Sequence, residues 1–317
     1  MKRTIPVLIL LILLNAGCES RGDKFPHFKI QEKLLGQIRN HEIKKASFIN
    51  LQKGFVAVSK DTILKTTDSC KTFSLSLADK SAWFEHIQFV NDSVGFVINR
   101  NNKIYNTLDG GNSWSKTYIS VPGAVLLDIA CISHDIVFIV AGGNPKSQKG
   151  YIIQSSDGGR SWISTASINL MNIHFIDDST GFASGYGGII KTTDGGKTWD
   201  TLSSLPATDL FFFDHEKGYY SYGRSLFKTV DGGNNWKLVR TIINPHWIVG
   251  EDFSKIEGLN RLQGNNLIFT LNARIFKITP NEKWFQYEFT RPYYQLQMIS
   301  DDKGIAYGFE NLILVQF

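Results

Sequence analysis

The chain has 317 residues, 42% of them hydrophobic and 13% aromatic, and a formal net charge of +5. This length and apolar content suffice for one large domain with a sizeable core. The charge is too mild to indicate nucleic-acid binding, and the basic residues are scattered along the sequence, as on a solvated surface.

The N-terminal segment has the features of an export signal. Lys2 and Arg3 precede an apolar run over residues 5–14 that is too short to span a bilayer. The sequence Ala16-Gly17-Cys18 resembles the lipobox of bacterial lipoproteins, although Asn15 stands where that family has an aliphatic residue. The resemblance implies a signal peptide over residues 1–17, a lipidated Cys18 and a tether over residues 18–26. We therefore expect an exported protein, lipid-anchored to a bacterial membrane on the periplasmic side or at the cell surface.

One eight-residue phrase recurs along the rest of the chain. A worn copy, TTDSCKTF, covers residues 66–73, and it is followed by TLDGGNSW (107–114), SSDGGRSW (155–162), TTDGGKTW (192–199) and TVDGGNNW (229–236). We call these five segments the aspartate phrases. Successive aspartates lie 41, 48, 37 and 37 residues apart; they are Asp68, Asp109, Asp157, Asp194 and Asp231. A recurrence of this period indicates a repeat architecture.

The sequence around each phrase repeats as well. Each unit consists of four short apolar or β-rich runs separated by turn residues. Four-stranded units of roughly 40 residues are typical of β-propeller blades. Five units carry a phrase, a sixth (267–284) retains Trp284, and a seventh (298–317) stops after three runs. Residues 27–35 could supply the missing strand and close the ring. The sequence thus predicts an all-β fold, a seven-bladed β-propeller of four-stranded antiparallel blades over residues 27–317.

The phrase resembles the Asp-box, or BNR repeat, S/T-x-D-x-G-x-x-W. A short carboxylate can accept backbone hydrogen bonds in its own turn, and glycine permits a positive φ there. Tryptophan supplies a large ring for burial between blades; the candidates are Trp114, Trp162, Trp199 and Trp236. The alternative of a calcium loop lacks the alternating oxygen ligands and the closing glutamate. The resemblance implies that the phrases lie between third and fourth strands, away from any binding face, so we predict a structural role and no metal.

A propeller offers a binding site at the mouth of its central channel, on the face opposite the phrases. The turns between second and third strands are rich in basic residues, and the innermost strands begin with polar residues. The hypothesis is a mouth that binds a polar or acidic partner, with arginines gripping carboxylates. The candidates are Arg100, Arg224, Arg261, Arg274, His86, His174, Asp128 and Asp209. The alternative is a water-filled polar funnel without a ligand.

Two connections are further candidates. A long insert over residues 241–262 contains His246 and Trp247, and Tyr293 and Tyr294 follow Pro292 on an analogous connection. Long loops on a rigid scaffold often bind partners. The alternative is that these loops cover an exposed patch.

Enzymatic readings find little support in the sequence. A sialidase needs three arginines, a tyrosine–glutamate pair and an aspartate, and its first arginine usually lies in a phrase like FRIP. The nearest text, FPHF at residues 25–28, has no arginine, and no tyrosine–glutamate pair can be assigned to Arg224, Arg274 and Arg291. The motifs HExxH, GxSxG and the P-loop are absent. We predict no enzyme activity and no cofactor, and we expect Cys70 and Cys131 to form no disulfide.

Over nearly the whole mature chain, the repeat F-x-D/N-x-x-x-G-F/Y…D-G-G-x-x-W resembles that of photosystem II assembly and stability factors. Those are seven-bladed, non-enzymatic propellers that help membrane complexes assemble. The resemblance implies a monomeric module at the cell envelope that binds a protein partner or an envelope complex, without nucleic acid. The alternative is a carbohydrate-directed protein, either a glycan binder or a sialidase-like glycoside hydrolase.

Overall fold

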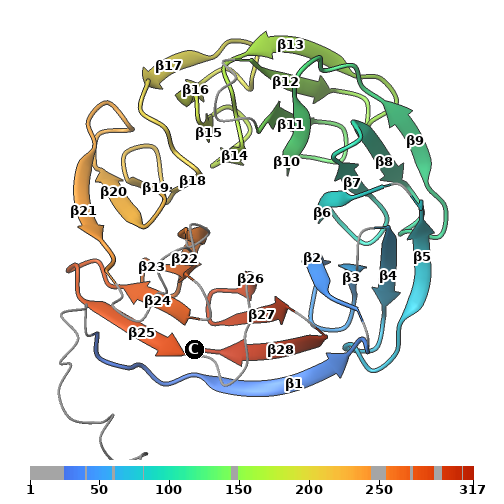
Figure 1. Cartoon of the computed structure of the whole chain (residues 1–317), viewed down its shortest axis with the longest axis horizontal. Coiled ribbons are helices and arrows are strands. Elements are labelled where there is room, and N and C mark those ends of the chain that lie inside the picture. The colour runs from blue at the N-terminus through green and yellow to red at the C-terminus, as the bar shows by residue number, and fades with distance from the viewer. Residues whose placement is uncertain are drawn as a thin grey trace, which may run out of the picture.

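The computed structural model describes residues 25–39, 41–58, 61–80, 82–143, 149–243, 255–271, 274–288, 295–308 and 310–317. These residues form seven four-stranded antiparallel sheets arranged as a ring around a central channel (Figure 1). The predicted seven-bladed β-propeller is therefore confirmed. Within the described ranges, no helix is long and apolar enough to cross a membrane.

Each blade begins with its innermost strand and ends with its outermost. Blade 1 comprises β2 (Ile43–Phe48), β3 (Gly54–Val58), β4 (Thr62–Thr66) and β5 (Ser74–Ala78); blade 2, β6 (Phe84–Phe89), β7 (Gly95–Asn99), β8 (Lys103–Thr107) and β9 (Ser115–Tyr118). Blade 3 comprises β10 (Val125–Cys131), β11 (Val137–Gly142), β12 (Gly150–Ser155) and β13 (Ile163–Ser167); blade 4, β14 (Asn172–Phe175), β15 (Gly181–Gly185), β16 (Gly188–Thr192) and β17 (Asp200–Ser203). Blade 5 comprises β18 (Asp209–Phe212), β19 (Gly218–Tyr222), β20 (Ser225–Thr229) and β21 (Lys237–Thr241); blade 6, β22 (Glu257–Leu262), β23 (Asn266–Leu271), β24 (Arg274–Ile278) and β25 (Trp284–Glu288).

Blade 7 joins the two ends of the chain. It comprises β26 (Gln295–Ser300), β27 (Lys303–Gly308), β28 (Asn311–Gln316) and, outermost, β1 (Gln31–Gln37). Strand β1 pairs antiparallel with β28, from Gln31 opposite Gln316 to Gln37 opposite Asn311. The prediction that the N-terminal stretch completes the last blade is confirmed, although the strand lies a few residues later than expected. Closing the ring in this way covers the edge that a three-stranded blade would expose.

The folded unit already includes residues that the sequence assigned to the tether. The ring of Phe25 stacks on that of Trp284 with centroids 5.5 Å apart, and Gln286 N–H donates to the carbonyl of Pro26 at 3.0 Å. Phe25 is only 8% exposed. The N-terminal segment therefore packs against β25 before it enters β1.

The repeated phenylalanine and glycine explain how the blades pack. The ring of Phe212 lies over Gly218, where a Cβ atom would come within 2.6 Å of it. The same ring stacks on Phe182 of the preceding blade, with centroids 3.6 Å apart. Phe55 and Phe89 stack likewise between blades 1 and 2, at 3.7 Å. Because glycine leaves room for a ring that reaches the preceding blade, this residue pair builds an inter-blade contact in blades 2, 4 and 5.

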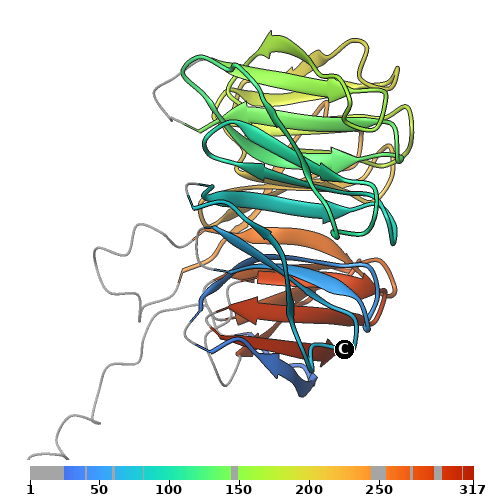
Figure 2. The same cartoon turned by 90° about the vertical axis from the view of Figure 1, so that its right-hand side faces the viewer.

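The turns sort onto two faces, which lie on opposite sides of the ring (Figure 2). The aspartate phrases occupy the turns between third and fourth strands, beside the turns between first and second strands, and we call this side the aspartate face. Backbone hydrogen bonds join the two turns within a blade, as from Gly110 N–H to the carbonyl of Ser93 at 2.8 Å. The turns between second and third strands and the connections between blades lie on the other side, the mouth face.

Candidate functional site

The aspartate carboxylates are occupied by their own turns. Asp109 accepts hydrogen bonds from the Ser113 N–H at 2.9 Å, the Ser113 hydroxyl at 2.6 Å and the Thr107 hydroxyl at 2.8 Å. The Thr107 oxygen in turn accepts from Gly111 N–H at 2.9 Å. The same pattern recurs in each of the other four phrases, around Asp68, Asp157, Asp194 and Asp231.

These bonds also set the protonation state of the carboxylates. Hydrogen bonds from the backbone and hydroxyl of Thr198 lower the pKa of Asp194 to about 2, because they stabilise the ionised form. Gly195 and Gly196 adopt φ values of 72° and 82°, which explains the glycine pair. No three His, Cys, Asp or Glu residues of the described ranges are placed to hold a metal ion. The aspartate phrases thus act as turn-forming elements.

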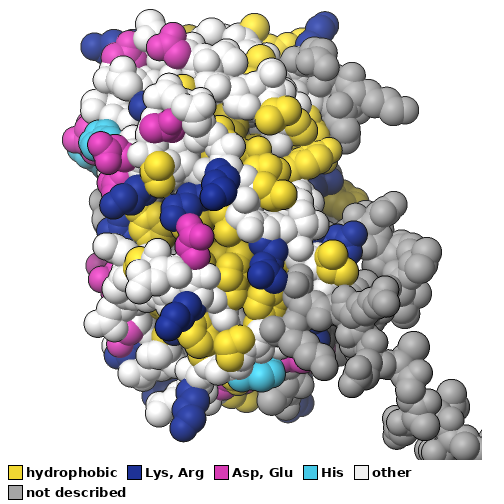
Figure 3. Space-filling model, turned by 90° about the vertical axis from the view of Figure 1, so that its left-hand side faces the viewer, with side chains coloured by type: hydrophobic (Ala, Val, Ile, Leu, Met, Phe, Trp, Pro, Cys, Tyr) yellow, Lys and Arg dark blue, Asp and Glu magenta, His cyan; other side chains and the backbone are white. Residues whose placement is uncertain are grey.

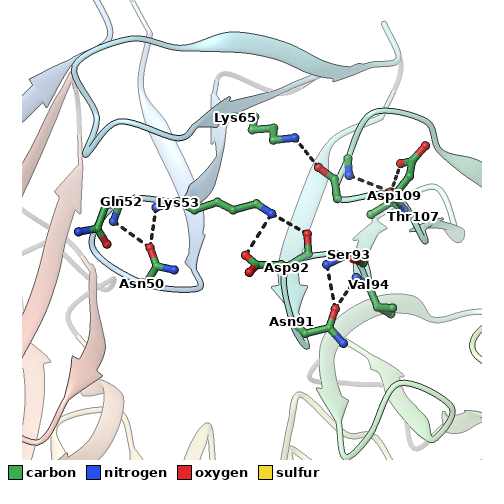
Figure 4. Close-up of polar contacts among 12 residues, drawn as sticks. Asn50, Gln52, Lys53, Lys65, Asn91, Asp92, Ser93, Val94, Thr107 and Asp109 are labelled. Atoms are coloured by element: carbon green, nitrogen blue, oxygen red, sulfur yellow. Dashed lines mark hydrogen bonds and ion pairs between the residues drawn. The ribbon is translucent and has the colours of Figure 1, made fainter.

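Lysines link the aspartate faces of blades 1 and 2 (Figure 4). Lys53 Nζ donates to the carbonyl of Asp92 at 2.6 Å and lies 3.1 Å from its carboxylate. Lys65 Nζ donates to the carbonyl of Gly110 at 2.7 Å. The phrase aspartates and these two lysines of the aspartate face therefore form hydrogen bonds within the protein.

The mouth face contains a cavity of about 770 Å³, and all seven innermost strands contribute to its lining. Five of the residues that the sequence placed at the mouth line it; they are His86, Arg100, Asp128, His174 and Asp209. Trp83, Lys45 and Asn172 also line it. The topology brings these positions together because each innermost strand begins at the mouth.

Most charged groups of the mouth cavity pair with one another. Arg100 grips the carboxylate of Glu85 with two hydrogen bonds, of 2.6 and 3.1 Å. His86 Nδ1 lies 2.5 Å from Asp128 Oδ1, and Lys255 Nζ lies 2.7 Å from Glu257. By contrast, Lys45 forms no ion pair with any described residue. Lys45 therefore offers the cavity a positive charge that the described part of the chain does not neutralise.

Two aspartates connect neighbouring blades at the mouth. Asp128 accepts a hydrogen bond from Ile173 N–H at 2.9 Å, and Asp209 accepts one from Leu259 N–H at 3.0 Å. Burial raises the pKa of Asp209 to about 7, against the opposing effect of its backbone hydrogen bonds. These two carboxylates hold blade 3 to blade 4 and blade 5 to blade 6.

A second row of polar residues also links the blades. The hydroxyl of Ser47 accepts from Phe89 N–H at 3.0 Å. Gln297 accepts from the Phe48 N–H at 2.8 Å and donates to the Phe48 carbonyl at 3.2 Å, which ties blade 7 to blade 1. His174 Nε2–H donates to the carbonyl of Phe212 at 3.2 Å, and burial lowers the pKa of this histidine. Sequence reasoning recognised the polarity of these positions but missed their role as inter-blade links.

The other predicted arginines lie outside the lining of the mouth cavity. Arg274 points to Glu288 on the outermost strand, with an ion pair of 3.3 Å. Arg261 donates to the carbonyl of Phe213 and lies over its ring, 5.2 Å from the centroid. Arg224 occupies an exposed turn between β19 and β20. Arg100 is thus the one arginine among the described lining residues, and no cluster of three arginines forms there.

The remaining candidates from the sequence lie outside the described residues; they are Cys18, His246, Trp247, Tyr293 and Tyr294.

The sequence did not identify Trp83 as a residue of the mouth. It placed Asn172 among the polar residues that begin the innermost strands but could not show the state of its side-chain oxygen. Trp83 lies beside the cavity, 48% exposed, in a left-handed backbone conformation with φ of 46°. Such a conformation is uncommon for a bulky residue, and strained backbone often accompanies functional sites. The side-chain oxygen of Asn172 is buried and has no hydrogen-bond partner among the described residues. A buried orphan acceptor is costly unless a ligand or water supplies a donor.

Comparison with solved structures shows the same fold. A structure described as YCF48 bound to D1 peptide aligns with a TM-score of 0.68 and 17% identity, covering 93% of this chain and 99% of that chain. YCF48 from Cyanidioschyzon merolae aligns with a TM-score of 0.67 and 13% identity, covering 90% and 98%. Virginiamycin B lyase from Staphylococcus aureus aligns with a TM-score of 0.71 and 10% identity, covering 91% and 99%.

These likenesses establish the seven-bladed propeller and leave the activity open. The similar structures include an enzyme as well as a protein solved with a bound peptide. No protein-family model and no curated protein sequence matches the chain. Function must therefore be argued from the mouth cavity itself.

Proposed function

We propose that the protein is an exported, lipid-anchored and non-enzymatic propeller that binds a segment of a protein partner in the mouth cavity and supports assembly of a complex at the cell envelope. The observation that carries this proposal is the mouth cavity itself, with an exposed ring at Trp83 and an unneutralised charge at Lys45. The aspartate phrases, as Asp-boxes of the BNR type, serve as structural turns in this account.

The chemistry of the mouth cavity suits binding better than catalysis. Arg100 and His86 are engaged by carboxylates of the cavity itself, at 2.6 and 2.5 Å, and Asp209 is held by two backbone N–H groups. A catalytic acid, base or nucleophile must instead reach the substrate in a suitable protonation state. A concave surface with an aromatic ring and a few convergent polar groups is typical of a recognition site.

The partner segment should carry a carboxylate or other polar acceptor for Lys45 and an apolar group for Trp83. YCF48 has been solved with a bound peptide, which supports a peptide-like occupant. The glycan alternative would use the same aromatic ring as a stacking platform, so the experiment must separate the two.

The test is affinity capture from detergent-solubilised envelope, read by mass spectrometry. We expect wild-type protein to capture a defined protein partner. The double variant Lys45→Glu/Trp83→Ala should bind that partner at least tenfold more weakly, which corresponds to a loss of at least about 1.4 kcal/mol in binding free energy. The matched control is Arg224→Ala/Arg274→Ala, which alters charge outside the lining and should retain capture. Thermal unfolding of all variants checks the fold. Recovery of a glycan, or sialoside hydrolysis, would instead establish the alternative.

The anchor is tested separately. Metabolic labelling with an alkyne-tagged fatty acid should mark the wild-type chain in membrane fractions and leave Cys18→Ser unmarked. An unlabelled wild-type protein would remove the lipid anchor from the proposal while leaving the mouth cavity as the binding site.

A further inference from the structure

One outer wall of the ring gathers basic and aromatic side chains from segments that are distant in sequence. On this side, lysine and arginine side chains surround exposed hydrophobic ones (Figure 3). We call the region the blade 5–6 wall; it comprises Lys228, Lys237, Arg240, Lys277, Lys283, Trp284 and Phe285. The strands beneath it are β20, β21, β24 and β25.

Cations of the wall lie against aromatic rings. The guanidinium of Arg240 lies 5.4 Å from the ring centre of Phe25 and 5.5 Å from that of Trp284. Lys277 Nζ lies 5.0 Å from the ring centre of Phe28 and 5.2 Å from that of Phe285. Such pairs combine an apolar body with a cationic head, the combination that residues at membrane–water interfaces use.

The wall keeps a net positive character. Glu282 pairs with Lys228 at 2.8 Å, whereas Lys237 and Lys283 are exposed and form no ion pair with any described residue. Among the other outermost strands, β5 (Ser74–Ala78) and β13 (Ile163–Ser167) contain no charged residue, β9 contains Lys116, β17 contains Asp200, and β1 contains Glu32 and Lys33. Strand β21 thus differs from these strands in carrying two cations, Lys237 and Arg240, and no acidic residue.

The N-terminal end of the described chain lies in this wall. Phe25 is buried beneath Arg240 and against Trp284. Cys18 precedes Phe25 by seven positions, so an extended tether between them spans at most about 25 Å. A domain of this size is about 50 Å across. A lipid on Cys18 could therefore bring the blade 5–6 wall to a membrane but could not bring the opposite wall there.

We propose that the blade 5–6 wall is the membrane-facing surface of the protein and binds anionic phospholipid headgroups. The orientation rests on the lipid anchor of the proposed function, whereas the headgroup contact is a property of the wall alone. Each lysine or arginine near an anionic surface strengthens binding roughly fivefold (about 1 kcal/mol). The wall therefore adds the second, electrostatic signal that stable membrane attachment needs beside acyl chains. In this orientation the propeller stands on its edge, and the mouth cavity opens sideways along the membrane.

The test uses the unlipidated mature chain, residues 18–317 with Cys18→Ser, which contains every strand of the ring. Cosedimentation is measured with vesicles of phosphatidylcholine alone and of phosphatidylcholine with phosphatidylglycerol, at low and high salt. We expect binding to the anionic vesicles only, weakened by salt. Lys237→Gln/Lys277→Gln/Lys283→Gln should bind about 100-fold more weakly. The matched control Lys71→Gln/Arg160→Gln/Lys197→Gln removes the same charge from the turns between third and fourth strands of blades 1, 3 and 4, and it should change binding by less than about threefold.

Orientation is read with an environment-sensitive fluorophore on one introduced cysteine, in a chain whose Cys70 and Cys131 are replaced by alanine. Leu238→Cys on β21 and Leu75→Cys on β5 replace leucines that are 50% and 67% exposed on opposite sides of the ring. The emission of the label at residue 238 should shift to the blue on anionic vesicles, and that of the label at residue 75 should not.

Equal vesicle binding by the two triple variants, or an emission shift at residue 75 alone, would overturn the proposal. The proposal would also be overturned if the wall variant still bound anionic vesicles but no longer captured an acidic protein that the wild type captures, because the wall would then bind a protein partner. Vesicle binding without fatty-acid labelling of Cys18 would remove the anchor and keep the headgroup site.

Discussion

The aspartate face and the mouth face of this propeller are built on opposite rules. On the aspartate face, each of five blades makes the same hydrogen bonds around one carboxylate, as at Asp109 and Asp194. At the mouth, equivalent positions carry different residues, such as His86, Asp128 and Asn172. What recurs in each unit serves the folding of that unit. The residues that differ between units include links between blades, such as Asp128, and the candidates for binding a specific partner.

The largest effect that we predict on the free energy of unfolding comes from replacing a glycine of the aspartate face, and a glycine of the mouth face serves as the comparison. At Gly196, φ is 82° and a Cβ atom would lie 2.3 Å from the buried ring of Phe138 in the preceding blade. We expect Gly196→Ala to lower the free energy of unfolding by about 3 kcal/mol or more, from backbone strain and overpacking. Gly223, on the mouth face, has a φ of 57° and open space around it, so Gly223→Ala should cost only about 1–2 kcal/mol. Urea unfolding measures both, and equal losses would contradict the distinction.

The second prediction is that an aspartate on each face contributes to stability with an opposite dependence on pH. The pKa of Asp194 is about 2 in the folded state. Its stabilisation is therefore complete above the unfolded value of about 4 and lost as pH falls through 2. The pKa of Asp209 is about 7, so the folded state holds a proton that the unfolded state releases near pH 4, and stability falls as pH rises from about 4 to 7.

Asparagine variants separate the two contributions. Asp209→Asn should flatten the decline in unfolding free energy between about pH 4 and 7. Asp194→Asn should reduce the loss below about pH 4 and leave the higher range unchanged. Chemical unfolding across this pH range is the measurement, and a steeper decline in Asp209→Asn would reverse the assigned sign.

The smallest predicted effect is a gain. In the worn phrase, Ser69 and Cys70 occupy the glycine positions, with φ values of 63° and 65°. Ser69→Gly should raise the unfolding free energy by up to about 1 kcal/mol, because glycine adopts this conformation without a steric penalty. Thermal unfolding would show the gain as a higher midpoint. A loss would mean that the Ser69 side chain stabilises the turn.

Much of the fold could be predicted because its signals are local. The phrase, the phenylalanine–glycine pair and the turn residues lie within one unit, so their period gives both the blade and the number of blades. Even the closing strand could be inferred, since a blade lacking one strand leaves an exposed edge. The mouth residues on the innermost strands were also located, because strand direction follows from the repeat.

The partners of those side chains could not be predicted, because they come from other blades. The sequence gives no indication that Gln297 bonds to Phe48 or that Arg274 points to Glu288. Nor could it show that scattered cations such as Lys237 and Lys283 meet on one wall. Pairings of this kind depend on tertiary geometry rather than on spacing within a unit.

The most direct test is capture of the proposed envelope partner by wild type and by two double variants, one from each face. We predict that Lys45→Glu/Trp83→Ala at the mouth abolishes capture, whereas Lys197→Glu/Val230→Ala on the aspartate face, with both side chains exposed, leaves it intact. Retention by the mouth variant together with loss by the aspartate-face variant would contradict it.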